Sequence, residues 1–243
     1  MHYWALTHPG CVRPQNQDAY KIEMLDSNSL LCVVCDGMGG AKSGNIASTL
    51  AADVFTQSVV SSWKPSMTQE AIDALLQSAV KLANFAVYDQ AMEFADFFGM
   101  GTTLVAVLIQ GKMATVVNVG DSRLYHILPD RICQVTRDHS LVQMMMDRGE
   151  LSAQEAKTYP GKNMITRAVG TEAVVQCDLF HLELEREDTL LACTDGLSNL
   201  LDEQEMLFEI VYDEDRQRCC QRLLDIALNR GAPDNVTCVL MQL

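Results

Sequence analysis

Aspartates stand at the ends of apolar segments, where carboxylates could bind cations. Asp36, Asp121 and Asp195 each follow an apolar run, and Asp36 and Asp195 are followed at once by Gly. Asp18 and Asp234 each stand shortly before an apolar run. The exit of one antiparallel strand lies beside the entrance of its neighbour, so these five carboxylates can share one rim of a sheet.

An aspartate at a strand end is most often ordinary turn chemistry, so none of the five indicates a site by itself. Together they would repel, because two carboxylates about 5 Å apart cost roughly 3 kcal/mol at an effective dielectric near 20. Such a cluster needs cations or raised pKa values. Hard oxygen ligands suit Mg²⁺ or Mn²⁺. Two such ions about 4 Å apart would hold a bridging water or hydroxide that attacks a phosphoryl group.

A zinc or redox site at Cys32 and Cys35 is disfavoured. These residues lie three apart in an apolar run of strand length, so their thiols point to opposite faces. Both are interpreted as small core residues.

Short strands and two blocks of helix must position the aspartates. Helical periodicity covers residues 47–58, a second helix starts near a capping box at Ser66 with Leu82 on its buried stripe, and a third covers 213–229. The four strands from 102 to 136 are separated by turn residues and are predicted to form one meander. This order predicts an α+β fold of stacked sheets flanked by helices. The predicted strands are 3–7, 20–25, 30–35, 102–109, 113–119, 123–128, 132–136, 175–182, 189–194 and 236–241.

Residues 138–171 are predicted to form a helical excursion between strands. Asp138 is expected to cap a short helix, and Ser152 with Glu155 forms a capping box. The sequence shows no repeat and no linker, so residues 1–243 are predicted to be a single domain.

Composition excludes several classes of protein. The chain has 243 residues, a formal net charge of −14, a pI near 4.6 and 48% hydrophobic residues. Nucleic-acid and anionic membrane partners are not expected, because both need clustered Lys and Arg. No apolar run approaches the length of a membrane span, and no export signal is visible. Nine scattered cysteines favour a reducing compartment, so a cytoplasmic location is expected.

Six ordered motifs identify a family resemblance that covers essentially the whole chain. In order and spacing they resemble the type-2C metal-dependent (PPM) serine/threonine protein phosphatases, most closely the bacterial branch. The resemblance implies a four-layer α-β-β-α sandwich of two antiparallel sheets. The motifs are Arg13-Pro-Gln-Asn-Gln-Asp18, Asp36-Gly-Met-Gly-Gly40, Gly101-Thr-Thr-Leu104, Gly120-Asp-Ser-Arg123, Thr194-Asp-Gly-Leu197 and Asp234-Asn-Val-Thr237.

The resemblance also implies roles for individual residues. Arg13 would bind the phosphate, beside Asp36 as the second catalytic residue. The alternative for Arg13 is a solvated surface arginine, although Arg13 lies close to Asp18 in the sequence and arginine commonly pairs with carboxylates. Segment 138–171 would be the family's flap, a mobile element that influences substrate choice. The implied metal ligands are Asp36 bridging two ions, the Gly37 carbonyl on one, Asp195 and Asp234 on the other, Asp18 through water, and Asp121 with Asp195 at a weaker third site.

The resemblance implies a hydrolase that removes phosphate from phosphoserine and phosphothreonine in proteins, using Mn²⁺ or Mg²⁺. The expected partners are phosphorylated proteins, namely a serine/threonine kinase and its substrates. Two departures stand out: Met38 replaces a proposed general-acid His of eukaryotic relatives, and the flap has Tyr159-Pro160 where bacterial members often show His-Pro. Two alternatives stay open: a catalytically weak regulator of the same fold that binds phosphoproteins, and a metal-dependent phosphodiesterase.

Overall fold

The structure is a computed structural model that describes residues 1–39, 43–213 and 215–243. Gly40, the last residue of the Asp36 motif, lies outside the described residues.

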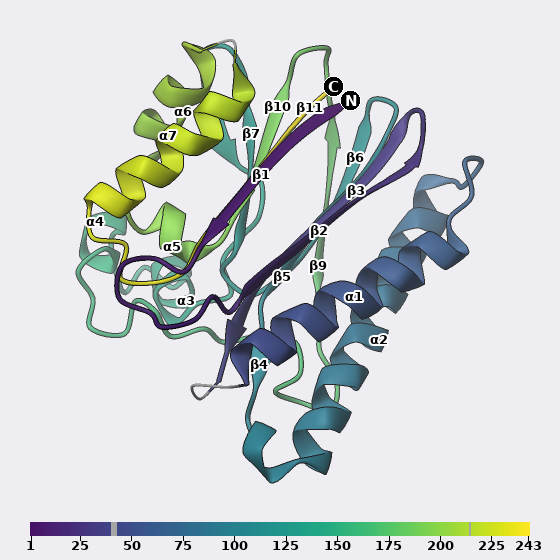
Figure 1. The fold of residues 1–243 in the computed structure, drawn as a ribbon, viewed down its shortest axis with the longest axis vertical. Coiled ribbons are helices and arrows are strands. Elements are labelled where there is room, and N and C mark those ends of the chain that lie inside the picture. The colour runs from purple at the N-terminus through teal and green to yellow at the C-terminus, as the bar shows by residue number, and fades with distance from the viewer. Residues whose placement is uncertain (40–42, 214) are drawn as a thin grey trace.

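Two antiparallel sheets form the centre of the molecule (Figure 1). The first has the order β1-β11-β10-β7-β8, with β1 His2–His8, β7 Arg123–Ile127, β8 Ile132–Gln134, β10 Thr189–Cys193 and β11 Val236–Gln242. The second has the order β2-β3-β5-β6-β9, with the short β4 also paired to β3. Its strands are β2 Asp18–Asp26, β3 Ser29–Met38, β4 Gly101–Thr102, β5 Leu104–Gln110, β6 Met113–Val119 and β9 Asp178–Glu183.

Helices cover the outer face of each sheet, so the molecule has four layers (Figure 1). The second sheet packs under α1 and α2, and the first packs under α5, α6 and α7. The helices are α1 Gly44–Ser62, α2 Gln69–Glu93, the 3₁₀ turn η1 Ala95–Phe97, α3 Leu141–Asp147, α4 Ala153–Ala156, α5 Asp195–Ser198, α6 Glu203–Val211 and α7 Arg216–Asn229.

Three hydrophobic cores hold these layers together. One lies between α1, α2 and the second sheet, one between the two sheets, and one between the first sheet and α5–α7. Cys32 belongs to the core between the sheets and Cys35 to the core under α1 and α2. The predicted opposite orientation of these two thiols is therefore confirmed. The predicted α+β sandwich of two antiparallel sheets flanked by helices is confirmed as well.

The single meander predicted for 102–136 is wrong. β5 and β6 pair in the second sheet, whereas β7 and β8 pair in the first. The chain crosses between the sheets at Gly120-Asp121-Ser122, where Gly120 has a φ of +104°. Local turn residues mark the hairpins, but both sheets are built from apolar strands, so the sequence pattern alone did not separate them.

Three helix details also differ from the prediction. Thr68, not Ser66, caps α2 by accepting from the Ala71 N–H. Leu82 is exposed, because the buried face of α2 is centred on Leu76, Ala83 and their neighbours. Leu82 directly precedes Ala83, and successive residues of a helix point in different directions. Asp215 caps α7, which begins at 216 and not at 213, and the capped helix α6 was not predicted.

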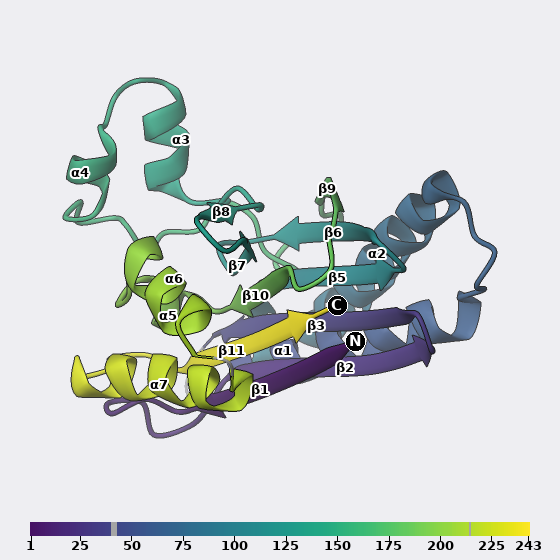
Figure 2. The same ribbon diagram turned by 90° about the horizontal axis from the view of Figure 1, so that it is seen from above.

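The segment 138–171 forms the predicted helical excursion, and Figure 2 shows α3 and α4 standing out from the sandwich. Ser140 caps α3, while Asp138 pairs with Arg123 and caps nothing. The predicted capping box of Ser152 and Glu155 is present at α4. None of the helices among the described residues combines the length and apolarity that crossing a membrane demands.

Candidate metal centre

The topology gathers the five predicted aspartates at one end of the two sheets. Asp18 opens β2 and lies directly opposite Asp36 in the β2–β3 register. In the first sheet, Asp195 follows β10, and Asp234 precedes β11, the antiparallel neighbour of β10. Asp121 lies at the crossing between the sheets, after β6. We call Asp18, Asp36, Asp121, Asp195 and Asp234 the aspartate cluster.

Hydroxyl groups of the Gly101–Leu104 motif fix the backbone of Asp36. The Asp36 N–H donates to Thr103 Oγ1 at 2.8 Å, and the Asp36 carbonyl accepts from Thr102 Oγ1 at 2.9 Å. Thr103 Oγ1 also contacts Ser122 Oγ at 2.6 Å. Asp36 is thereby tied to the residue that follows Asp121.

Two threonines orient Asp18. Thr237 Oγ1 donates to Asp18 Oδ2 at 2.6 Å, and Thr194 Oγ1 donates to the same oxygen at 2.9 Å. The other oxygen, Asp18 Oδ1, is buried and has no hydrogen-bond partner among the described residues. A buried carboxylate oxygen without a donor is costly unless a water or a cation satisfies it.

Close backbone packing brings Asp195 beside Asp234. A Cβ atom on Gly196 would lie 1.9 Å from the Asn235 carbonyl oxygen, so only glycine permits this approach. Asp195 begins α5, and Asn199 Nδ2 donates to Asp195 Oδ2 at 3.0 Å. Gly37, which follows Asp36, allows a similar close approach, because a Cβ on Gly37 would lie 2.0 Å from the Gly44 carbonyl oxygen.

Asn235 fastens the N-terminal loop to the cluster. Its side chain donates to the carbonyls of Pro9 and Gln15 at 2.8 and 2.9 Å, and accepts from the Gln17 N–H at 2.7 Å. Sequence reasoning assigned no role to Asn235, Thr194 or Thr237. The signal in the sequence was that these three residues lie in the same two motifs as Asp195 and Asp234.

Arg13 lies at the edge of the cluster. Its Nη2 atom pairs with Asp234 Oδ2 at 2.8 Å, and its side chain is 52% exposed. The hydrogen bond and charge of Asp234 raise the pKa of Arg13, so the guanidinium stays charged. Arg13 is therefore a half-exposed arginine whose guanidinium is anchored by a carboxylate of the cluster.

Burial and mutual repulsion shift the titration of the aspartates. Burial raises the pKa of Asp18 to about 7, against the hydrogen bonds from Thr237 and Thr194. Burial raises the pKa of Asp121 to about 7, and the charge of Asp195 adds to that shift. The pKa of Asp36 lies well above its ordinary value, first because of burial and then because of Asp18 and Asp195. The pKa of Asp195 is raised by burial and by Asp234.

The cluster suits hard divalent cations. It offers carboxylate oxygens, one of them the unpartnered Asp18 Oδ1, and it contains more negative charge than its surroundings neutralise. Over residues 1–39, 43–213 and 215–243, the His, Cys, Asp and Glu side chains nowhere form a group of three or more that could hold a metal ion between them. Mg²⁺ does not need such a group, because it usually takes one or two carboxylates and keeps several waters.

Met38, two residues after Asp36, lines a cavity of about 580 Å³. Its other walls come from the end of the flap segment, where Val169 bridges to Thr102 of β4, and from residues 172–176, which follow that segment. The lining residues are Met38, Ile165, Thr166, Arg167, Ala168, Thr171, Glu172, Val174, Val175 and Gln176.

Comparison with known proteins matches this arrangement to one family. The protein-family model described as "Protein phosphatase 2C" matches residues 13–222. The serine/threonine phosphatase stp of Listeria innocua is 34% identical over 249 residues, which cover all of this chain and 96% of that protein.

Solved structures give the same result. The serine/threonine phosphatase Stp1 from Staphylococcus aureus superposes with a TM-score of 0.93 at 35% identity, covering 99% of this chain and 94% of that one. The catalytic domain of the phosphatase PstP, solved with two manganese ions, has a TM-score of 0.84 at 31% identity, covering 98% of this chain and 96% of that one.

Proposed function

Because this chain belongs to the protein phosphatase 2C family and is a serine/threonine protein phosphatase, we propose that its aspartate cluster holds the divalent cations used in hydrolysis. The observation that carries this proposal is the unpartnered Asp18 Oδ1 within a group of mutually repelling carboxylates. The ligands in this proposal are Asp36 bridging two ions, the Gly37 carbonyl, Asp195, Asp234, Asp18 through water, and Asp121 with Asp195 at a third, weaker site.

The ions in this proposal are Mn²⁺ or Mg²⁺. Oxygen ligands and the absence of sulfur from the cluster support them. The PstP structure, which contains two manganese ions, supports the same assignment by similarity. When bound, two such ions polarise a phosphoryl group and activate a water for in-line attack.

The chain's own side chains bind and orient the phosphate. Asp234 anchors one nitrogen of Arg13, and in this proposal the other N–H groups donate to phosphate oxygens. Asn235 fixes the loop that carries Arg13 against the loop that carries Asp234. Met38 has no transferable proton, so it cannot protonate the leaving serine or threonine oxygen.

The proposed substrates are phosphorylated proteins, including a serine/threonine kinase and that kinase's targets. The names of the relatives support phosphoserine and phosphothreonine as the chemical class. We propose that the cavity beside Met38 receives residues next to the phosphorylated side chain, since it is lined both by Met38, two residues after Asp36, and by residues of the flap segment.

We propose further that residues 1–243 act as one catalytic domain with its flap at 138–171. The three cores, each shared between neighbouring layers, support this view. A cytoplasmic location is also proposed. All nine cysteines lie within the described residues as free thiols, which suits a reducing compartment.

The test is phosphate release from phosphothreonine and phosphoserine peptides with Mn²⁺, comparing the unmodified protein with Asp36→Asn. We expect the substitution to lower kcat/KM by at least about a hundredfold, because ion binding supplies several kcal/mol to the transition state. Asp130→Asn, which removes an exposed turn carboxylate, is the matched control and should keep full activity. Full turnover by Asp36→Asn, or preference for a phosphodiester, would overturn the proposal.

A further inference from the structure

The outer face of α2 and the turn after it expose several large apolar side chains. Phe98 is 78% exposed, Phe85 62%, and Leu82, Met92 and Phe94 are about half exposed. Leu82, Phe85 and Met92 lie on one stripe of the helix, at spacings of three and seven residues. We call these five residues the α2 patch. Clustered exposed apolar side chains of this kind mark interaction surfaces.

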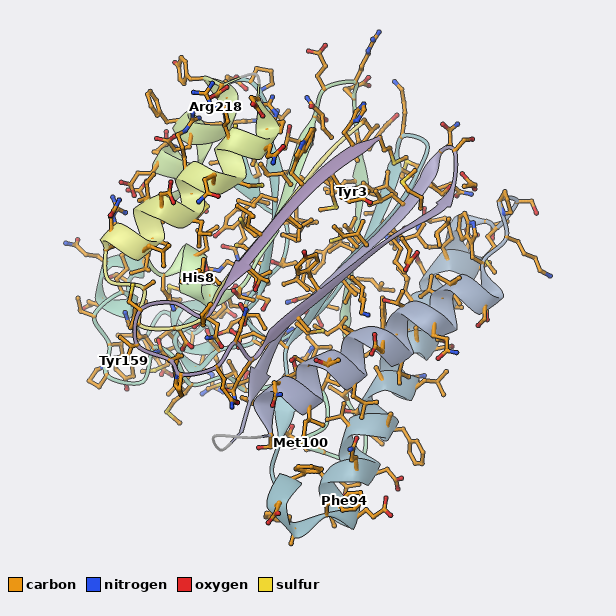
Figure 3. The ribbon with its side chains drawn as sticks, in the orientation of Figure 1. Tyr3, His8, Phe94, Met100, Tyr159 and Arg218 are labelled. Atoms are coloured by element: carbon orange, nitrogen blue, oxygen red, sulfur yellow. The ribbon has the colours of Figure 1, made fainter. Side chains whose placement is uncertain are left out.

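The α2 patch is separate from the candidate metal centre. In Figure 3 Phe94 lies at the end of the molecule formed by α2 and η1, on a different side from Tyr159 of the flap segment and Arg218 of α7. The patch contains none of the proposed metal ligands and none of the residues that line the cavity beside Met38. Its exposure is therefore not explained by phosphate chemistry.

The charges around the C-terminal half of the patch are acidic, whereas the exposed Lys81 precedes Leu82 at the N-terminal end of the patch. Asp89 lies on the same helical stripe between Phe85 and Met92, and Glu93 and Asp96 flank Phe94; all three carboxylates are exposed. Across residues 1–39, 43–213 and 215–243, no ion pair engages any of them. The last turn of α2 contains no basic residue. A helix C-terminus carries partial negative charge, so these carboxylates add to an already negative end.

This charge pattern selects the occupant. A second copy of the chain would bring the same carboxylates and a net charge of −14 to the contact, which opposes association. A bilayer with anionic lipids would be repelled in the same way. A protein segment with Lys or Arg beside apolar side chains would instead gain both charge complementarity and apolar burial.

We propose that the α2 patch is a docking surface for a basic amphipathic helical segment of a partner protein. Leu82, Phe85 and Met92 belong to α2, and Phe94 and Phe98 flank the 3₁₀ turn η1, so the patch offers side-chain ridges and no free strand edge. Phe85 and Phe98 would be the apolar anchors, and Asp89, Glu93 and Asp96 would pair with the partner's cations at the rim.

The probe is a fluorescein-labelled peptide of leucine and lysine, about 18 residues or five helical turns long, with leucines on one face. A second peptide has glutamate in place of lysine. The fluorescence anisotropy of the peptide is measured with saturating Mn²⁺, which keeps the lysines of the peptide from binding to the aspartate cluster. The lysine peptide should bind, and its affinity should fall as NaCl rises from about 50 to about 500 mM. The glutamate peptide should not bind.

Matched variants locate the binding. Phe85→Ser combined with Phe98→Ser should weaken the lysine peptide at least about tenfold, as expected when two anchor residues are lost. Tyr212→Ser is the control, because Tyr212 at the end of α6 is also 78% exposed and lies outside the patch. This variant should bind the lysine peptide with unchanged affinity. Glu93→Gln combined with Asp96→Asn keeps the apolar surface and should flatten the salt dependence, so the test survives any misfolding of the first variant.

Hydrogen exchange with the bound peptide should protect residues 82–98. Equal binding by the phenylalanine variant, or protection at the cluster or the flap segment, would overturn the proposal. It would equally be overturned if sedimentation showed a dimer abolished by that variant, or if anionic vesicles bound through the patch. Phosphopeptide turnover should stay the same in every variant, so failure here is distinguishable from failure of the proposed metal site.

Discussion

At the scale of single residues, the hydroxyls around Asp18 link the sequence motifs to the candidate metal chemistry. Thr194 and Thr237 both donate to Asp18 Oδ2 and leave Oδ1 for another partner. Hydrogen-bond donors to a metal-binding carboxylate fix its orientation, and their loss commonly lowers metal affinity by about one or two orders of magnitude.

Thr237→Val therefore should weaken Mn²⁺ binding about tenfold. Valine keeps the shape of threonine but removes the 2.6 Å hydrogen bond to Asp18, which we expect to lower the free energy of unfolding by about 1 to 2 kcal/mol as well. Titration calorimetry with Mn²⁺ measures the affinity. Thr237→Ser keeps the hydroxyl and should restore it. Unchanged affinity in the valine variant would show that this hydrogen bond does not position Asp18.

The sequence predicted the acidic residues of the cluster because their strand-end positions and motif spacing are local features. It did not predict that Asn235 would hold the N-terminal loop, or that Thr194 and Thr237 would orient Asp18. Those roles depend on which loops and strands become neighbours, and the Asn235 contacts span more than 200 residues of sequence.

At the scale of elements, the base of the flap segment is joined to the crossing between the sheets. The His139 ring accepts the buried Gly120 N–H at Nδ1 over 3.0 Å, and the His139 backbone bonds to Gly120 and Thr166. Burial lowers the pKa of His139, which favours the neutral ring that can accept this bond. Ser140 bridges to Ile165, so the two ends of the segment are closed against each other.

His139→Ala should loosen this base. The Gly120 N–H would lose its acceptor, which costs about 1 to 3 kcal/mol of unfolding free energy. We expect faster hydrogen exchange across 138–168, read by mass spectrometry. His139→Asn offers a side-chain oxygen near the position of Nδ1 and should recover part of the protection. Equal exchange rates in the alanine variant and the unmodified protein would contradict this role.

Most strands and long helices could be predicted from apolar periodicity, which depends on neighbouring residues only. The distribution of strands between the sheets could not. β6 and β7 follow each other across a short turn, as in a hairpin, yet they belong to different sheets. The missed helix α6 did carry a signal, the capping box of Asp202 and Glu205 ahead of Met206 and Ile210.

At the scale of the whole molecule, the cluster couples stability to pH. The pKa values of Asp18 and Asp121 are raised from 3.8 to about 7, so the folded chain retains protons that the unfolded chain releases. This contribution is fully present below about pH 4 and is lost as pH rises through about 7. The metal-free protein should thus be less stable at pH 7.5 than at pH 5.

Thermal unfolding in EDTA tests this dependence. We expect Tm to fall by several degrees between pH 5 and pH 7.5, and Mn²⁺ to restore more stability at the higher pH, because cations replace the lost protons. Asp18→Asn removes one titrating group and should reduce the fall. A Tm that rises over this range in EDTA would contradict the raised pKa values.

The proposed hydrolysis depends on divalent ions bound between carboxylates that lie far apart in the sequence. The most direct measurement is anomalous diffraction from crystals soaked in Mn²⁺, recorded above the manganese edge. We predict two strong peaks among Asp36, Asp195, Asp234 and the Gly37 carbonyl, equal in number to the manganese ions of the PstP structure, and loss of both in Asp36→Asn. Ordered carboxylates with no anomalous density between them, in a crystal of active protein, would contradict the account.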